Sequence, residues 1–166
     1  MDSDAGKFTT NARDLQEAAN LQARLSAAAA AAAEAIPKNT TPGNNIVDDE
    51  AIPAVSIDEG AHKYVLVSAV PPSSSSGLER STTRLFVYSK RNAKYHVNVA
   101  EYLVPQLESS GYTDIQIKGG GRIRRDDGDK RIHIFGHSYG FGMADHASAK
   151  GAVGRCAKYQ DYEVTW

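Results

Sequence analysis

The stretch HKYVLVSAV, residues 62–70, constrains the fold of this 166-residue chain more than any other. Its apolar residues are nearly consecutive instead of alternating, so both faces of an extended strand would be hydrophobic. A strand of this kind lies inside a sheet whose two faces are both covered. TRLFVYS (83–89) repeats the pattern, and the intervening PPSSSSGLERS (71–81) is typical of a mobile loop. The sequence therefore predicts an α/β protein.

The segments that follow predict how this sheet is completed. VNVAEYLVPQLESSG (97–111) is typical of a helix, which Asn98 can cap and which Pro105 should kink or interrupt. IQIKGGGRI and KRIHIFG flank RRDDGD, where Asp-Gly indicates a hairpin turn. MADHASAKGAVGRCAKY (143–159) predicts a second helix, and YEVTW (162–166) a last strand. We therefore expect a single mixed β-sheet flanked by two main helices.

Residues 1–50 predict an N-terminal tail that is separate from the folded domain at 51–166. The tail contains LQEAANLQARLSAAAAAAAEA, which has high helix propensity but little large apolar surface to bury. Such a segment should be disordered or only transiently helical, and PKNTTPGNN (37–45) should be a linker. Its acidic residues argue against a mitochondrial targeting peptide, and no apolar stretch is typical of a secretion signal.

Composition excludes several classes of protein and site. Residues 51–166 carry 15 basic and 12 acidic side chains, an excess that suits an anionic ligand but is too small for nucleic-acid binding. The single cysteine, Cys156, excludes an internal disulfide and a cysteine-based zinc site. His133 and His137 would stand roughly 13 Å apart on one strand, too far to bind one metal ion. No apolar run approaches the ~20 residues that span a membrane. We expect a cytoplasmic monomer that needs no metal and no cofactor.

GHSYG, residues 136–140, fits the G-x-S-x-G pattern that presents a nucleophilic serine in α/β-hydrolases. The only later histidine, His146, directly follows Asp145, so their side chains would point about 100° apart on a helix and could not complete a triad. We therefore do not expect Ser138 to be a nucleophile. The loop glycines, with a helix beginning near Met143, instead predict a backbone N–H site for an anion such as phosphate. An ordinary turn is the alternative.

Three side chains outside this loop are candidates for the same site. His96 lies just before the predicted first helix, whose N-terminal dipole favours the neutral imidazole and keeps a base available near pH 7. Lys63 opens the first buried strand and could balance a phosphate charge. Arg122 ends GGGR (119–122), which predicts a bend or bulge, and is a candidate anion contact. A histidine at a junction, a lysine that reaches toward solvent and a surface arginine are the structural alternatives.

From about Ile52 to Trp166 the chain resembles the small protein histidine phosphatases of the janus/ocnus type. The resemblance rests on six motifs in the family's order: HKYVLV, YHVNV, IKGGGRI, DKRIHIFGHSYGFG, DHAS and KYQDYEVTW. It implies a mixed sheet flanked by helices, an activity that needs no metal, and phosphohistidine proteins as substrates. Residues before position 50 have no counterpart in this resemblance.

Matched by position, the resemblance implies a phosphate-binding loop within 138–142. Ser138, Tyr139 and Gly140 would bind phosphate largely through backbone N–H groups, and Lys63 would contact the same group. We therefore expect hydrolysis of the P–N bond of phosphohistidine, with this loop and the lysine holding the phosphoryl oxygens.

The resemblance also implies that His96 is the catalytic histidine. It would act either as a general base toward water or as a nucleophile that is transiently phosphorylated. One position departs from the family, because Tyr88 stands where an arginine usually precedes this histidine by eight residues. Either Lys90 or Arg91 supplies that charge, or the substrate is bound differently. A phosphoprotein-binding module without turnover is therefore the alternative function.

Overall fold

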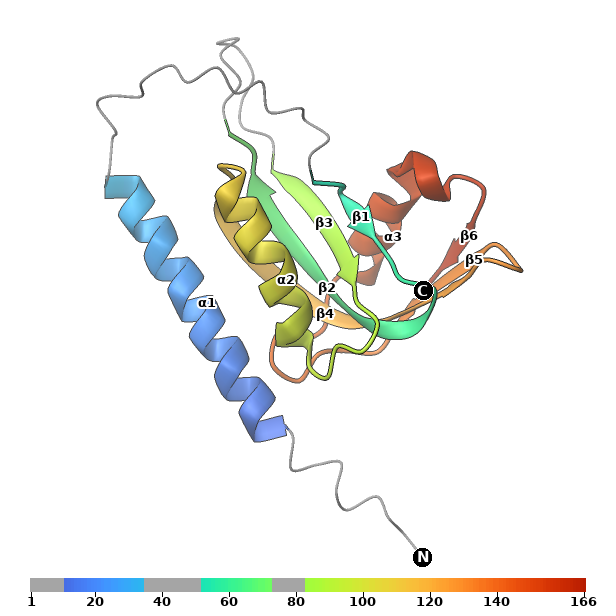
Figure 1. The fold of residues 1–166 in the computed structure, drawn as a ribbon, viewed down its shortest axis with the longest axis horizontal. Helices are drawn as coiled ribbons and strands as arrows, with labels where there is room; N and C mark the ends of the chain where they lie inside the picture. The colour runs from blue at the N-terminus through green and yellow to red at the C-terminus, as the bar shows by residue number, and fades with distance from the viewer. Residues whose placement is uncertain (1–10, 35–51, 73–82) are drawn as a thin grey trace, which may run out of the picture.

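The structure is a computed structural model that describes residues 11–34, 52–72 and 83–166 (Figure 1). Its elements, in chain order, are α1 (Asn11–Glu34), β1 (Val55–Ser56), β2 (Gly60–Val70), β3 (Arg84–Ser89), α2 (His96–Ser109), β4 (Thr113–Asp126), β5 (Arg131–Phe135), α3 (His146–Arg155), η2 (Ala157–Tyr159) and β6 (Glu163–Thr165). The strands form one sheet with the order β1-β3-β2-β4-β5-β6. The inner pairs are antiparallel, whereas β1 pairs parallel with β3 and β6 pairs parallel with β5.

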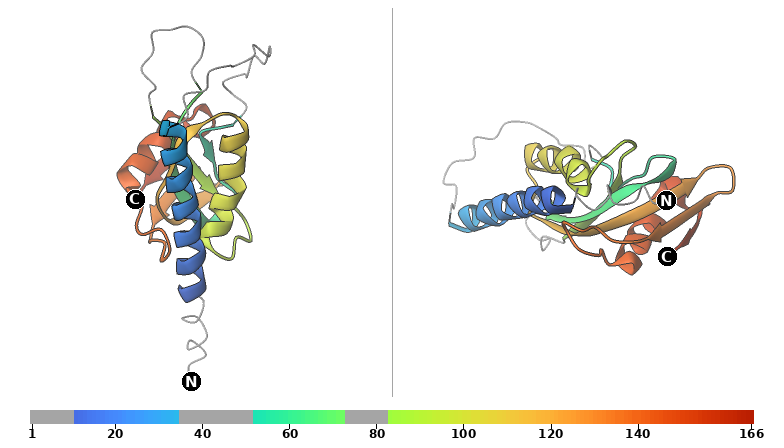
Figure 2. Two further views of the ribbon diagram at one scale, coloured as in Figure 1. Left: turned by 90° about the vertical axis from the view of Figure 1, so that its left-hand side faces the viewer. Right: turned by 90° about the horizontal axis from the view of Figure 1, so that it is seen from below.

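Helices cover both faces of this sheet, as the doubly apolar strand predicts. Successive side chains of β2 point to opposite faces. Val65 and Val67 face α1 and α2, whereas Tyr64 and Leu66 face α3 and pack near Val153. Figures 1 and 2 show α1 and α2 on one side of the sheet and α3 on the other. The expectation of a mixed α/β sheet between helices is confirmed, as are the hairpin formed by β4 and β5 and the last strand, β6.

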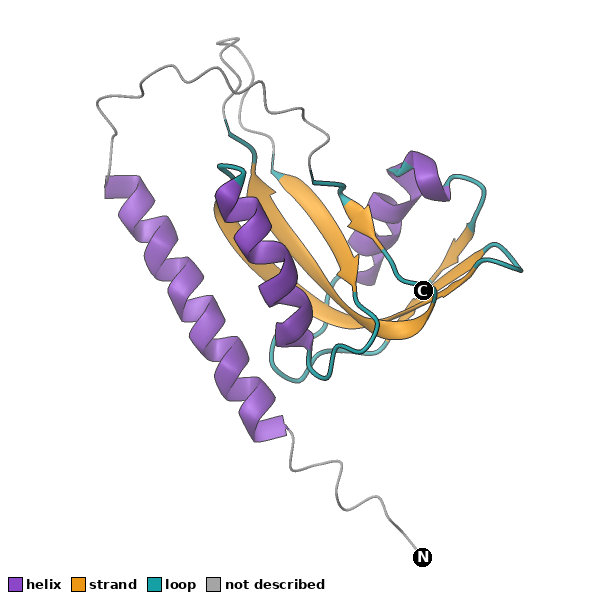
Figure 3. Cartoon of the chain, in the orientation of Figure 1, coloured by secondary structure: helices purple, strands orange, loops and turns teal. Residues whose placement is uncertain are grey.

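Both predicted helices form, with differences at their ends (Figure 3). Asn98 lies inside α2 rather than before it, and its side-chain oxygen accepts a hydrogen bond from the Tyr95 backbone N–H at 3.0 Å. Pro105 lies within an uninterrupted α2, so of the two predicted alternatives, a kink or an interruption, the interruption is wrong. Its ring is exposed, while the opposite side of α2 packs on the sheet and offsets the lost hydrogen bond. The helix expected from Met143 begins later, at His146.

The helix α1 corrects the expectation that the first 50 residues lie outside the core. Ala18, Leu21 and Leu25 are at most 8% exposed and belong to the core cluster on the α2 face. Together with Asp14 they recur every three or four residues and line one side of the helix. Alanine-rich composition conceals this stripe, because only two of its positions are large and apolar. The linker at 37–45 lies outside the described residues. No described helix is both long and apolar enough to cross a membrane.

Candidate phosphate-binding site

Lys63 of β2 and Arg122 of β4 lie directly opposite each other in the antiparallel register. Side chains at opposed positions leave the same face of a sheet. This is the face under α1 and α2, because Val65 lies two residues further along β2 and packs there. Burial and then the charge of Arg122 lower the pKa of Lys63. The sheet therefore holds two neighbouring cations whose mutual repulsion an anion would relieve.

Glycines in β4 allow the rest of the site to approach these cations. The register between β2 and β4 shifts beside Gly119, which has φ 131, so the predicted bulge is confirmed. A Cβ on Gly120 would lie 2.7 Å from the Tyr64 carbonyl oxygen, 3.0 Å from His96 Cδ2 and 3.2 Å from Ser138 Cβ. The histidine and the serine therefore both pack against Gly120. Any other residue at this position would place a Cβ too close to them and to the Tyr64 carbonyl.

His96, the first residue of α2, is a neutral base whose Nδ1 has no hydrogen-bond partner among the described residues. Its Nε2 donates a hydrogen bond to the Gly121 carbonyl at 2.9 Å, so Nδ1 keeps its lone pair. Burial lowers the pKa of His96 to about 4, and the charges of Lys63, Arg122 and His137 also act to lower it. The sequence predicted the neutral state from the helix dipole, but burial is the larger cause.

The loop between β5 and α3 is closed by hydrogen bonds around Ser138. Its carbonyl accepts from Gly142 N at 2.9 Å, and its own N–H donates to the Gly142 carbonyl at 3.3 Å. The Ser138 hydroxyl oxygen accepts from Phe141 N at 3.1 Å. In the described part of the chain, no acceptor binds the N–H groups of Tyr139 and Gly140. The loop is thus held in shape while two successive donors stay free, an arrangement suited to an anion.

Two anchors fix this loop against the sheet. Gly120 N donates to the Gly142 carbonyl at 3.0 Å, which joins the loop to β4. His146 Nε2 donates to the Gly136 carbonyl at 2.9 Å, while its Nδ1 accepts from the Tyr64 hydroxyl at 2.7 Å. Sequence reasoning rejected His146 as an esterase histidine and otherwise counted it only within the DHAS motif. The structure gives it the different task of joining the base of the loop to β2.

The structure argues against a nucleophilic serine and against a helix-end contribution to the anion site. Ser138 is 1% exposed, and its hydroxyl closes the loop. At the start of α3, the Asp145 carboxylate accepts hydrogen bonds from Ala147 N and Ser148 N. Those donors are therefore occupied, and the expectation that the helix supplies free amides is wrong. The Tyr139 and Gly140 N–H groups of the loop, in contrast, have no acceptor among the described residues.

The position that usually holds an arginine in the family has a structural role here. Tyr88 is buried, its hydroxyl donates to the Pro53 carbonyl at 2.7 Å, and burial raises its pKa to about 12. Lys90 Nζ lies 3.7 Å from the ring centroid of Tyr102, and Arg91 binds the loop before β2. Neither cation is among the charges that act on the site histidine. The positive charge at this site comes from the strand pair of β2 and β4.

His137 is a member of the site that sequence reasoning missed. It was weighed only as a metal partner of His133, but its charge acts on His96 and its ring packs edge-on against Tyr139 at 5.0 Å. His137 directly precedes Ser138 in the sequence, and this position could have indicated that it belongs to the site. His133 instead binds the Thr165 hydroxyl at 2.9 Å. No group of three or more potential metal ligands occurs among the described residues.

The fold and the site together define a small α/β domain that places a loop with two unpaired N–H groups beside a neutral histidine. The Janus/Ocnus family profile matches residues 49–163, and the chain belongs to this family. The chain is 36% identical over 122 residues to the human 14 kDa phosphohistidine phosphatase, covering 73% of this chain and 94% of that protein. The pig protein of the same name is 34% identical over 119 residues, covering 69% and 89%. Sex-regulated protein janus-A of Drosophila pseudoobscura pseudoobscura is 34% identical over 114 residues, covering 68% and 73%.

Proposed function

We propose that this chain is a metal-independent protein phosphohistidine phosphatase. Two curated relatives that align over most of their length carry the name phosphohistidine phosphatase. The observation that carries the proposal is the arrangement around Gly120, where the ring of His96 and the side chain of Ser138 both lie within 3.2 Å of the position that a Cβ would take. We further infer a cytoplasmic monomer that acts on phosphohistidine-containing proteins, without nucleic-acid or membrane partners.

The phosphoryl group would lie between the loop and the two strand cations. The free N–H groups of Tyr139 and Gly140 would bind two of its oxygens, and the Ser138 hydroxyl retains its proton as a further donor. Lys63 and Arg122 would balance the charge that spreads over these oxygens in a loose transition state. Because the P–N bond is labile, positioning and charge stabilisation supply most of what the reaction needs.

His96 would supply the chemical step through Nδ1, since Nε2 is held by the Gly121 carbonyl. As a general base, Nδ1 accepts a proton from water while the water oxygen bonds to phosphorus and the P–N bond breaks. The departing imidazole nitrogen takes up a proton, which leaves histidine and inorganic phosphate. As a nucleophile, Nδ1 itself bonds to phosphorus while the substrate P–N bond breaks and the departing imidazole nitrogen takes up a proton. Water then hydrolyses the new P–N bond, which releases inorganic phosphate and restores His96. A phosphorylated His96 trapped by alkaline quenching would identify the second route.

A phosphohistidine protein assayed in the presence of EDTA tests this function. His96→Ala should lower kcat/KM by about 100-fold or more, the scale of general-base loss. His133→Ala is the matched control, because that histidine is exposed and hydrogen-bonded to the last strand. The kcat/KM of this variant should stay within twofold of that of the unmutated chain. Undiminished turnover in His96→Ala would contradict the mechanism. Phosphate binding without turnover in the unmutated chain would instead favour a phosphoprotein-binding module.

A further inference from the structure

The helix α1 lies directly on the phosphate-binding loop. At Gly140, the position of a Cβ would be 2.6 Å from Ala18 Cβ and 2.9 Å from the Asp14 carbonyl oxygen. The space between this part of the loop and α1 therefore does not admit even a methyl group. A phosphoryl group with its three oxygens is larger, so it cannot enter there while α1 stays in place.

The same helix brings a carboxylate to the cations of the site. Asp14 is 5% exposed, and its Oδ1 has no hydrogen-bond partner among the described residues. The charge of Lys63 acts to lower the pKa of Asp14, although burial is the larger cause and raises it. A buried carboxylate without a partner costs free energy, and an incoming phosphoryl group would compete with it for the same lysine.

The proposed catalytic groups are largely covered in this arrangement. His96 and Ser138 are 5% and 1% exposed, so a phosphohistidine on another protein has little direct access to them. We propose that α1 is an autoinhibitory helix, which closes the phosphate-binding loop with Asp14 in place of the phosphoryl group and moves away when a phosphoprotein binds. The inference rests on the proposed function for the identity of the incoming ligand. The closure itself would exclude any phosphate group from this loop.

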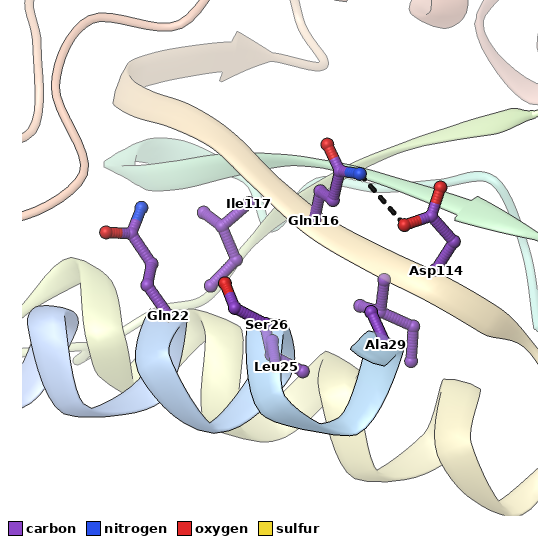
Figure 4. Close-up of a pocket in the computed structure, with 8 residues that line it drawn as sticks. Gln22, Leu25, Ser26, Ala29, Asp114, Gln116 and Ile117 are labelled. Carbon is purple, nitrogen blue, oxygen red and sulfur yellow. Dashed lines mark hydrogen bonds between the residues drawn. The ribbon is translucent and has the colours of Figure 1, made fainter. Parts of the chain in front are cut away.

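The attachment of α1 suits reversible displacement. Its large apolar anchors are Leu21 and Leu25, both at most 8% exposed. Toward its C-terminal end, a groove of about 450 Å³ separates it from β4 (Figure 4). The groove is lined by Gln22, Leu25, Ser26, Ala29, Asp114, Ile115, Gln116 and Ile117. A segment with few buried contacts beside such a groove opens at lower cost than the rest of the domain.

Loosening the anchors in the full-length chain tests the proposal. Leu21→Ser combined with Leu25→Ser should raise kcat/KM for a phosphohistidine protein, and the affinity for inorganic phosphate measured by calorimetry, by about tenfold. A gain of this size corresponds to an open state that is populated to roughly 10% in the unmutated chain. Leu15→Ser is the matched control, because Leu15 lies on the same helix but is 47% exposed, and both quantities should stay within twofold.

A second measurement does not depend on variants or on turnover. Saturating the unmutated chain with inorganic phosphate should speed hydrogen exchange of the α1 amides by several-fold, because phosphate and the docked helix exclude each other. Slower exchange, or lower phosphate affinity in the double variant, would overturn the proposal and make α1 part of the binding site. An unchanged exchange rate on adding phosphate, together with equal phosphate affinity in the double variant and the unmutated chain, would also overturn the proposal. If phosphate displaces α1 but no form hydrolyses phosphohistidine, the closure stands and the proposed enzyme activity fails.

Discussion

Lys63 and Arg122 face each other across β2 and β4, so the sheet places two like charges at directly opposed positions. Such a pair destabilises a sheet by roughly 0.2–1 kcal/mol when nothing lies between the charges. Its presence beside a loop with free N–H groups is understandable if an anion is bound there. The pair therefore links a small cost in fold stability to the affinity of the site.

Arg122→Gln should separate these two effects. We expect kcat/KM and phosphate affinity to fall by about tenfold, because one of the two cations is lost, while the free energy of unfolding rises by up to about 0.5 kcal/mol. Arg124→Gln is the control, since Arg124 lies on the same strand opposite Ala61 and should change neither quantity appreciably. Urea denaturation and phosphate titration measure the two effects. A loss of stability in Arg122→Gln without a loss of affinity would contradict this interpretation.

The protonation of His96 should make the fold sensitive to mild acid. Its pKa is lowered from 6.5 to about 4 in the folded chain, so the unfolded chain takes up the proton first as the pH falls. The stability from this group is complete above pH 6.5 and is lost between about 6.5 and about 4, costing about 2 kcal/mol between pH 7 and pH 5. Urea denaturation at both pH values checks this. His96→Gln should lose about 2 kcal/mol less over the same interval, because it lacks the titrating group.

Gly120→Ala should damage the site directly. The new Cβ would lie 2.7 Å from a backbone oxygen of β2 and 3.0 Å from the ring of His96, so the strand or the histidine must move. We expect a loss of about 2 kcal/mol in stability and of most of the activity. Gly154→Ala in α3 is the matched control, because a Cβ there meets nothing within 4 Å. It should stabilise the chain by about 0.5–1 kcal/mol and leave turnover unchanged.

Ser138→Ala should weaken the loop more than the chemistry. Without the hydroxyl, the N–H of Phe141 loses its acceptor in a buried position, which costs about 1–3 kcal/mol of unfolding free energy. The N–H groups of Tyr139 and Gly140 remain, so kcat/KM should fall by about tenfold or less. Thermal denaturation and the phosphohistidine assay measure the two effects. A loss as large as that of His96→Ala would show that the hydroxyl has a greater part in the reaction.

Tyr88→Arg should not restore the arginine that is usual in the family. Tyr88 is 3% exposed and its hydroxyl is bonded to the Pro53 carbonyl, so an arginine would place an unpaired charge in the core. We expect a loss of about 3 kcal/mol or more, read from urea denaturation, without a gain in phosphate affinity. Tyr88→Phe, which removes only the hydroxyl, should cost about 1 kcal/mol. A stable and more active Tyr88→Arg would overturn our account of this position.

The parts of the fold that could be predicted are those whose cause is local. Two unbroken apolar strands required cover on both faces, and the Asp127–Gly128 turn required a hairpin. The pairing of Lys63 with Arg122 could not be predicted, because shifting the register by one residue would move a side chain to the other face. The family resemblance singled out the same residues without showing that they are neighbours.

The docking of α1 was beyond sequence reasoning for a related reason. The buried stripe at Asp14, Ala18, Leu21 and Leu25 holds one charge and one small residue, so its apolar character is weak. What makes the helix fit is the absence of a side chain at Gly140, more than a hundred residues away in the chain. A contact of this kind depends on two surfaces matching in shape, which neither segment encodes alone.

The shortness of the outer strands has a consequence for a domain whose covering helix opens. β5 is also short and pairs with β4 only at residues 122–126, so residues 113–117 of β4 have a neighbouring strand on their β2 side alone. This part of β4 lies beside α1, across the groove that both line. A displaced α1 would therefore uncover a strand edge as well as the binding site, and an unpaired edge can accept another extended segment.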